Sequence, residues 1–204
     1  MIRTQLLVAA PLLLAACNQA EAPDAPPAAL DEAAVIAASQ PVAQEYGMAL
    51  QAQLAAAFAE GGPMQGVEVC HAVAPQIAAE RSAASGAQVS RVSDRNRNPD
   101  GRVTDDIAPH YARLAGQPMV DGQPAETVWR SGEGEMARVN YLRAIPMQEQ
   151  PCSTCHGTDV DPALAVRIAE LYPDDLATGF EPGDLRGALL VSWPAERFAT
   201  GDDT

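Results

Sequence analysis

Residues 151–157 read PCSTCHG, with two cysteines three positions apart and a histidine directly after the second. Cys-x-x-Cys-His is the attachment motif of c-type haem. At this spacing Cys152 and Cys155 can form thioether bonds to the two vinyl groups of one porphyrin. His156 is then held under the iron as an axial ligand. We therefore expect one covalently bound haem c.

Other chemistries use the same residue types. Structural zinc sites usually have four ligands, but the chain has no second Cys-x-x-Cys, and His71, His110 and His156 form no usual spaced pair. A thioredoxin-like dithiol follows an early strand of a βαβ unit, whereas this motif comes late in the chain. A plain disulfide between Cys152 and Cys155 would leave His156 without a role.

Haem iron needs a second axial ligand or an open site. Cys70 is the one thiol left unexplained, and a helix turns the neighbouring His71 about 100° away from it. Only one of the two can therefore point at an iron. A buried cysteine acting as a small hydrophobe is the alternative for Cys70. The remaining candidate ligands are His110, Met64, Met119, Met136 and Met147.

Arginines in the stretch 91–99 are candidates to bind the haem propionates. Arg91, Arg95 and Arg97 lie there, and guanidinium groups match carboxylates in bidentate geometry. The alternative is a solvated loop with local ion pairs, which contribute little.

The N-terminal residues carry a targeting signal. The apolar stretch 6–16 is far shorter than the roughly 20 residues of a membrane-spanning helix. Small residues precede Cys17 and resemble the lipobox of bacterial lipoproteins. We expect a signal peptide at 1–16, lipidation of Cys17, and a Pro/Ala-rich tether at 17–30. The mature protein would then face the periplasm on a lipid anchor, with the outer membrane favoured.

Composition limits the partners and the fold. The 204-residue chain carries a net charge of −14, whereas nucleic-acid binding needs clustered Lys and Arg, so we expect no nucleic-acid partner. Helices followed by strands predict one α+β domain over residues 31–200 with an antiparallel sheet. Expected helices are 31–60 (divided at Pro41 and ended by Gly61-Gly62-Pro63), 64–80, 104–115 (capped by Thr104) and 162–171; expected strands are 87–93, 125–131, 137–147 and 187–193.

Four stretches together resemble a family of exported c-type haem domains with a PAS-like fold. That family was long catalogued as a domain of unknown function and occurs alone or as the sensor part of bacterial signalling proteins. The stretches are VCHAVAPQIA (69–78), RVSDRNRNP (91–99), YLRAIPMQEQPCSTCHG (141–157) and YPDDLATGFEPGDLRGALLVSWP (172–194).

The resemblance implies a specific ligand set. Cys152 and Cys155 would bind the haem, with His156 on one side of the iron and a cysteine, at the position of Cys70, on the other. N-terminal helices would pack on a central antiparallel sheet, with the Cys-x-x-Cys-His segment as an insertion. His71 beside Cys70 departs from the pattern and leaves a ligand switch between the two open.

These expectations combine in a lipid-anchored haem protein that acts as a redox or small-ligand sensor or as an electron carrier, rather than as an enzyme. Its partner would be an unidentified redox or signalling protein. One alternative is a periplasmic thiol–disulfide oxidoreductase that uses Cys152 and Cys155. Another is a peroxidase-like haem enzyme, which needs a distal acid or base from His71 or His110.

Overall fold

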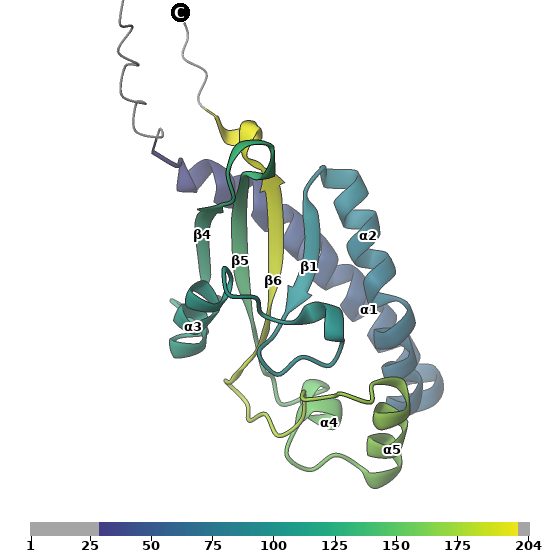
Figure 1. Cartoon of the computed structure of the whole chain (residues 1–204). Helices are drawn as coiled ribbons and strands as arrows, with labels where there is room; N and C mark the ends of the chain where they lie inside the picture. The colour runs from purple at the N-terminus through teal and green to yellow at the C-terminus, as the bar shows by residue number, and fades with distance from the viewer. Residues whose placement is uncertain (1–28, 200–204) are drawn as a thin grey trace, which may run out of the picture.

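The computed structural model describes residues 29–199 (Figure 1). The expected signal peptide, Cys17 and nearly all of the tether lie outside the described residues. Within the described part of the chain, no helix combines the length and the apolar character needed to cross a bilayer.

A four-stranded antiparallel sheet forms the centre of the molecule, in the order β1-β6-β5-β4 (Figure 1). β5 pairs with β6 along almost its whole length, with Tyr141 opposite Val191. The predicted α+β class with an antiparallel sheet is confirmed, while the PAS-like comparison stays a prediction. The strands are β1 (Gln88–Val92), β4 (Glu126–Ser131), β5 (Arg138–Pro146) and β6 (Leu185–Pro194), with a separate ribbon of β2 (Met119–Val120) and β3 (Gln123–Pro124).

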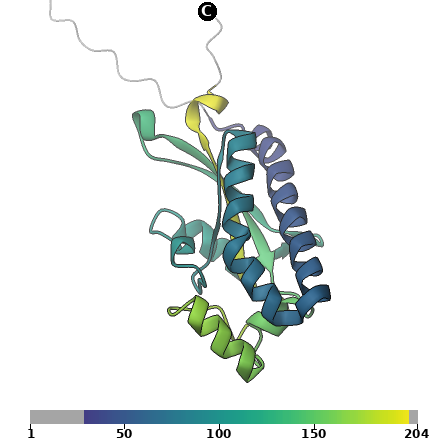
Figure 2. The same cartoon turned by 90° about the vertical axis from the view of Figure 1, so that its right-hand side faces the viewer.

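Helices cover both faces of the sheet and its lower end. α1 (Glu32–Ala72) and α2 (Ala74–Ser85) run side by side over one face (Figure 2). α3 (Ala108–Gly116) covers the other face, and α4 (Cys152–His156) and α5 (Pro162–Leu171) lie below the end of the sheet in Figure 1. Short 3-10 helices occupy Pro99–Gly101, Gly134–Met136 and Ala195–Phe198.

The two central strands are buried on both faces. In β5, Val139 and Tyr141 pack in the cluster under α1 and α2, whereas Leu142 and Ala144 pack in the cluster that includes Leu114 of α3. Alternate residues of a strand point to opposite faces, so burial on both sides requires apolar residues throughout. This explains why both strands are apolar along most of their length.

Two predicted boundaries of the N-terminal helices are wrong. Pro41 does not divide α1, because Ser39 and Ala43 on either side are buried and hold the helix in place; the departure from helical geometry comes at Gly62. The next helical segment ends at Ala72 rather than at residue 80. Pro75 lies in the first turn of α2, where its missing N–H is not needed.

The third helix begins later than predicted, and one helix was not predicted. α3 starts at Ala108, with Pro109 in its first turn, instead of at Thr104. Thr104 contributes its carbonyl rather than its side chain, because the N–H groups of Ile107 and Ala108 both donate to that oxygen. The Cys-x-x-Cys-His residues themselves form α4, which sequence patterns did not indicate because it is only one turn long.

Candidate functional site

Two adjoining cavities of about 470 and 400 Å³ lie beside the lower end of the sheet, and we treat them as lobes of one central cavity. The larger lobe is also bordered by Cys152 and Cys155. The central cavity therefore brings together six of the seven residues that the sequence pointed to for the cofactor, all but Arg95, from four separate elements or loops. The residues shared by both lobes are Tyr46, Cys70, Arg91, Arg97, His156 and Arg186.

A break in α1 brings Cys70 to the cavity. Gly62 has φ 68° and ψ −156°, which interrupts the helix between 32–61 and 63–72. Gly66 then packs directly on Phe58, since a Cβ at residue 66 would lie 2.3 Å from Cε2 of Phe58. The short second part of α1 thus folds back against the first, and Cys70 in its last turn faces the cavity.

α4 places three residues of the motif around the larger lobe. Cys152 packs against Met147, Ala177 and Phe180, while Cys155 packs against the cluster that contains Val67. Both thiols and His156 border the same lobe. One turn of helix therefore presents both attachment cysteines and the histidine to a single space.

His156 is held in one tautomer and kept neutral. Its Nδ1 lies 2.7 Å from the carbonyl oxygen of Ala177, and a carbonyl can only accept, so Nδ1 carries the proton and donates. Burial, reinforced by the nearby charges of Arg186 and Arg97, holds the pKa of His156 well below its usual value. Nε2 is then left as an unprotonated lone pair, the state that a metal ligand requires.

Arg97 holds the surroundings of His156 together. Its Nε donates to Asp175 at 3.0 Å, and its Nη2 donates to the carbonyls of Cys155 at 2.8 Å and Ala177 at 3.3 Å. Only 7 % of the Arg97 side chain and 10 % of the Asp175 side chain are exposed. Asp175 also accepts from the N–H of Ala177, so this pair fixes the carbonyl that binds His156.

The other arginines of the site differ from the prediction or were missed by it. Arg95 donates to the Thr178 carbonyl and lies 3.8 Å over the Phe180 ring, and it does not border the central cavity. Arg186 borders both lobes, although it was not among the predicted site residues. The available signal was one charge within the apolar run LRGALLVSW at 185–193.

The other candidates for a second axial ligand lie elsewhere. His71 is exposed and contacts Tyr172 edge-on, with 5.1 Å between ring centroids, and His110 stacks on Trp129 at 4.0 Å. Met147 is buried in its own cluster. Of the ligands considered from the sequence, only Cys70 and His156 border the central cavity within the described residues. The exposed candidates are Met64, Met119 and Met136.

The state of the cysteines bears on the two other chemistries considered for the motif, a reactive dithiol and a zinc site. Cys70, Cys152 and Cys155 are all free. Burial raises the pKa of Cys155 to about 11, so this thiol stays protonated near neutral pH and is a weak nucleophile. The part of the chain that the structure describes also contains no group of three or more His, Cys, Asp or Glu side chains arranged to hold a metal ion.

The walls of the larger lobe suit a flat apolar group. Aliphatic and aromatic side chains form much of the surface between the thiols and the arginines. Such a surface would shield a macrocycle from water. The two thiols could attach it, the imidazole could bind its metal, and the cations could bind its carboxylates. The residues present therefore fit a haem. The apolar lining residues include Leu50, Leu54, Phe58, Val67, Ile145 and Leu189.

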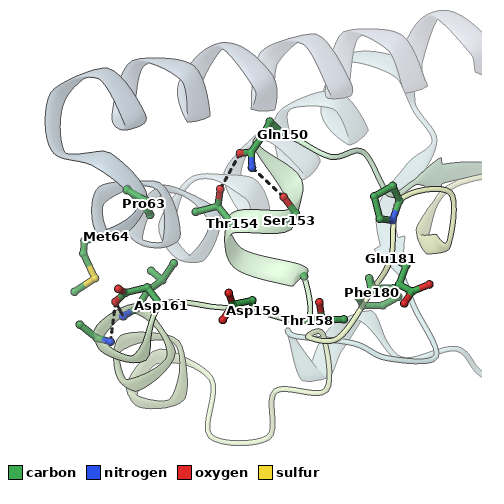
Figure 3. Close-up of a pocket in the computed structure, with 14 residues that line it drawn as sticks. Pro63, Met64, Gln150, Ser153, Thr154, Thr158, Asp159, Asp161, Phe180 and Glu181 are labelled. Carbon is green, nitrogen blue, oxygen red and sulfur yellow. Dashed lines mark hydrogen bonds between the residues drawn. The ribbon is translucent and has the colours of Figure 1, made fainter.

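A separate hollow of about 660 Å³ lies between α4, α5 and the second part of α1, and it shares no lining residue with the central cavity (Figure 3). Its polar groups serve local structure. Gln150 donates to Ser153 at 3.2 Å and accepts from Thr154 at 3.1 Å. Asp161 accepts from the first N–H groups of α5. We assign no ligand to this hollow.

Comparison with known proteins agrees with this site. The model of the Tll0287-like family matches residues 19–194, and the chain belongs to that family. The crystal structure of the cyanobacterial heme-protein Tll0287 is 28 % identical in sequence, with a TM-score of 0.56 over 80 % of this chain and 94 % of that one. The resemblance to a haem-domain family that we inferred from sequence is confirmed. Comparison with curated proteins gives no match.

Proposed function

We propose that this protein binds one haem in the central cavity and holds it covalently as haem c. Cys152 and Cys155 form the thioether bonds, and His156 and Cys70 are the axial ligands. One observation carries the proposal: these four residues come from α1 and α4 and border a single lobe. The similarity to a solved heme-protein supports it.

The chain's own residues determine how such a site behaves. When bound, haem supplies a one-electron iron couple. Ala177 fixes the tautomer of His156 and leaves Nε2 available for the metal. Cys70, as a thiolate, donates electron density and favours the oxidised state. The apolar wall of the larger lobe lies beside both ligands.

The role that fits this ligand set is redox sensing or electron transfer. If His156 and Cys70 both bound the iron, they would leave no coordination position for a substrate in the resting state. A peroxidase-like enzyme is less well supported, because His71 and His110 do not line the central cavity. A thiol–disulfide oxidoreductase is less well supported, because the similar solved structure is that of a heme-protein and His156 would have no role in dithiol chemistry.

The test is an absorption spectrum of the mature protein, made in a periplasm with haem-attachment machinery. We expect haem that survives acid-acetone extraction and low-spin ferric bands typical of thiolate ligation. Cys70→Ala should abolish the thiolate bands while the haem stays attached. A colourless protein would reject the proposal, and unchanged ferric bands in Cys70→Ala would reject Cys70 as a ligand.

We also propose that the protein is a lipoprotein on the periplasmic side of a membrane, anchored through Cys17. Support comes from the sequence alone. Cys17→Ser should release the protein from the membrane fraction in cell fractionation without changing its haem content. Retention of the Cys17→Ser variant in the membrane fraction would contradict the anchor.

A further inference from the structure

Four arginines border the central cavity, and they differ in whether a carboxylate neutralises them. Arg97 pairs with Asp175, and Arg143 has Glu126 at 3.8 Å. Arg91 and Arg186 border both lobes and form no ion pair with any residue of 29–199.

Arg186 is the more unusual of these two. The residue is 7 % exposed, and its Nε has no hydrogen-bond partner among the described residues. The Phe180 ring lies 5.3 Å from its guanidinium carbon. Burial, together with the charges of Arg91 and Arg97, lowers the pKa of Arg186 to about 9, so it is still a cation at neutral pH.

The one carboxylate that acts on Arg186 from nearby, Asp175, is already paired with Arg97. Burial raises the pKa of Tyr46, beside Arg91, and raises that of Tyr111, near Arg186, to about 12, so both hydroxyls stay neutral. Asp100 is the one carboxylate among the lining residues, and it is exposed. A buried cation without a partner is strongly unfavourable. The missing negative charge therefore has to come from whatever fills the cavity.

We propose that Arg91 and Arg186 bind the two propionate carboxylates of the haem, and that Arg97 serves only to hold α4. This inference rests on the proposed function. Two guanidinium groups would balance two carboxylates within one cavity, and Arg forks bind carboxylates in bidentate geometry. The sequence had pointed to Arg91, Arg95 and Arg97 for this role, but Arg95 does not border the cavity. Two of the three nitrogens of Arg97 already bond Asp175 and two carbonyls.

The proposal predicts opposite effects of one substitution on the haem-free and haem-bearing protein. In the full chain made without haem attachment, Arg186→Met removes an unpaired buried cation and should raise the melting temperature by roughly 5 °C or more. In the haem-bearing protein the same change leaves a propionate unpaired and should lower the melting temperature by a similar amount. Arg130→Met, at an exposed arginine of β4, is the matched control and should change neither.

A second readout does not require the haem-free chain to fold. Resonance Raman bands of propionate bending in the haem-bearing protein should shift in Arg186→Met and in Arg91→Met. They should stay in place in Arg130→Met, and Arg186→Lys should give an intermediate shift because it keeps the charge but loses the fork. Unchanged propionate bands in both Met variants would overturn the proposal.

Two further outcomes distinguish a failure of the propionate assignment from a failure of the proposed haem binding. A chain that carries no haem would overturn both the inference and the proposed function. If millimolar inorganic phosphate raised the melting temperature of the haem-bearing protein, and Arg186→Met abolished that rise, the pair would be free for another anion and the propionate assignment would be wrong.

Discussion

Two buried arginines near the central cavity, Arg97 and Arg186, differ in whether other groups of the protein satisfy them. Arg97 is as buried as Arg186, but a carboxylate and two carbonyls satisfy it. Breaking a buried ion pair on one side leaves an uncompensated charge, which is much more unfavourable than the loss of an exposed pair. The Arg97–Asp175 pair is therefore expected to matter for stability far more than the ion pairs of the surface.

Asp175→Asn tests this expectation. The variant leaves Arg97 buried without a counter-charge and should lower the free energy of unfolding by about 3 kcal/mol, measured by urea titration of the purified protein. Glu45→Gln breaks the Glu45–Arg81 pair, whose side chains are 53 % and 30 % exposed, and should change it by less than about 1 kcal/mol. Equal small losses in both variants would contradict the structural role of the buried pair.

The lowered pKa of His156 predicts that the stability of the haem-free chain depends on pH. Burial depresses its folded-state pKa well below the unfolded value of about 6.5, so the unfolded state binds the proton first as pH falls. Its contribution to stability is present above about pH 6.5 and is lost progressively below that pH. His156→Gln lacks this contribution.

Urea titrations at pH 7.5 and 5.5 measure the effect. The haem-free wild-type chain should lose about 1 kcal/mol more between these values than the haem-free His156→Gln variant does. The variant serves as the control for all the carboxylates that titrate in the same range. Parallel losses in the two proteins would show that His156 is not held neutral by its surroundings.

Among the elements, α1 connects the core to the cavity. Its first part, 32–61, packs Val35, Ala43 and Tyr46 on the sheet, and its second part, 63–72, carries Cys70. The two parts meet at Gly62, whose positive φ with extended ψ is a conformation that is accessible almost only to glycine. The backbone at residue 62 therefore determines where the thiol of Cys70 lies.

Gly62→Ala should lower the free energy of unfolding by about 1–3 kcal/mol. Nothing lies within 4 Å of an added Cβ, so the effect comes from the backbone and not from a clash. In the haem-bearing protein it should also weaken the thiolate bands of the ferric spectrum, because Cys70 is displaced.

Gly116→Ala is the matched control, in α3 and away from the central cavity, with equally open space around the added Cβ. At a regular helical position alanine should leave stability unchanged or raise it by about 0.5–1 kcal/mol. If the two variants behaved alike, the break at Gly62 would not be what positions Cys70.

At the scale of the whole molecule, the net charge of −14 determines which redox reagents approach. A field of one sign raises the encounter rate of oppositely charged molecules, and added salt screens it. The arginines at the central cavity do not change the sign of the total. If the protein carries the proposed haem, its partner is expected to present a basic surface.

Stopped-flow kinetics tests this expectation. Reduction of the haem-bearing protein by a strongly reducing cationic reagent such as the methyl viologen radical should slow as ionic strength rises from about 10 to 150 mM. Oxidation of the reduced protein by the anionic ferricyanide should become faster over the same range. Rates that do not depend on salt would show that the field at the haem is not that of the whole molecule.

Sequence by itself determined the features that depend on neighbours along the chain. The two cysteines and the histidine of 152–156 share one turn whatever the rest of the chain does, so their joint chemistry could be inferred from spacing. The α+β class and the four strands of the sheet followed from apolar periodicity and turn residues. The predicted division at Pro41 was wrong because packing of the helix outweighed the local tendency of proline to break it.

Only the tertiary structure decided which distant residues meet. Arg97 and Asp175 are 78 positions apart, and nothing in either local stretch indicated the pair. Spacing alone left seven candidates for the second axial position, from which the family resemblance favoured Cys70. Packing placed Cys70 alone among them at the cavity that contains His156. Arg186 was overlooked because the role of a charged residue in a strand depends on the groups around it in the folded chain, which the local sequence does not show. Local patterns specify elements, whereas the contacts between elements depend on the packing of the whole chain.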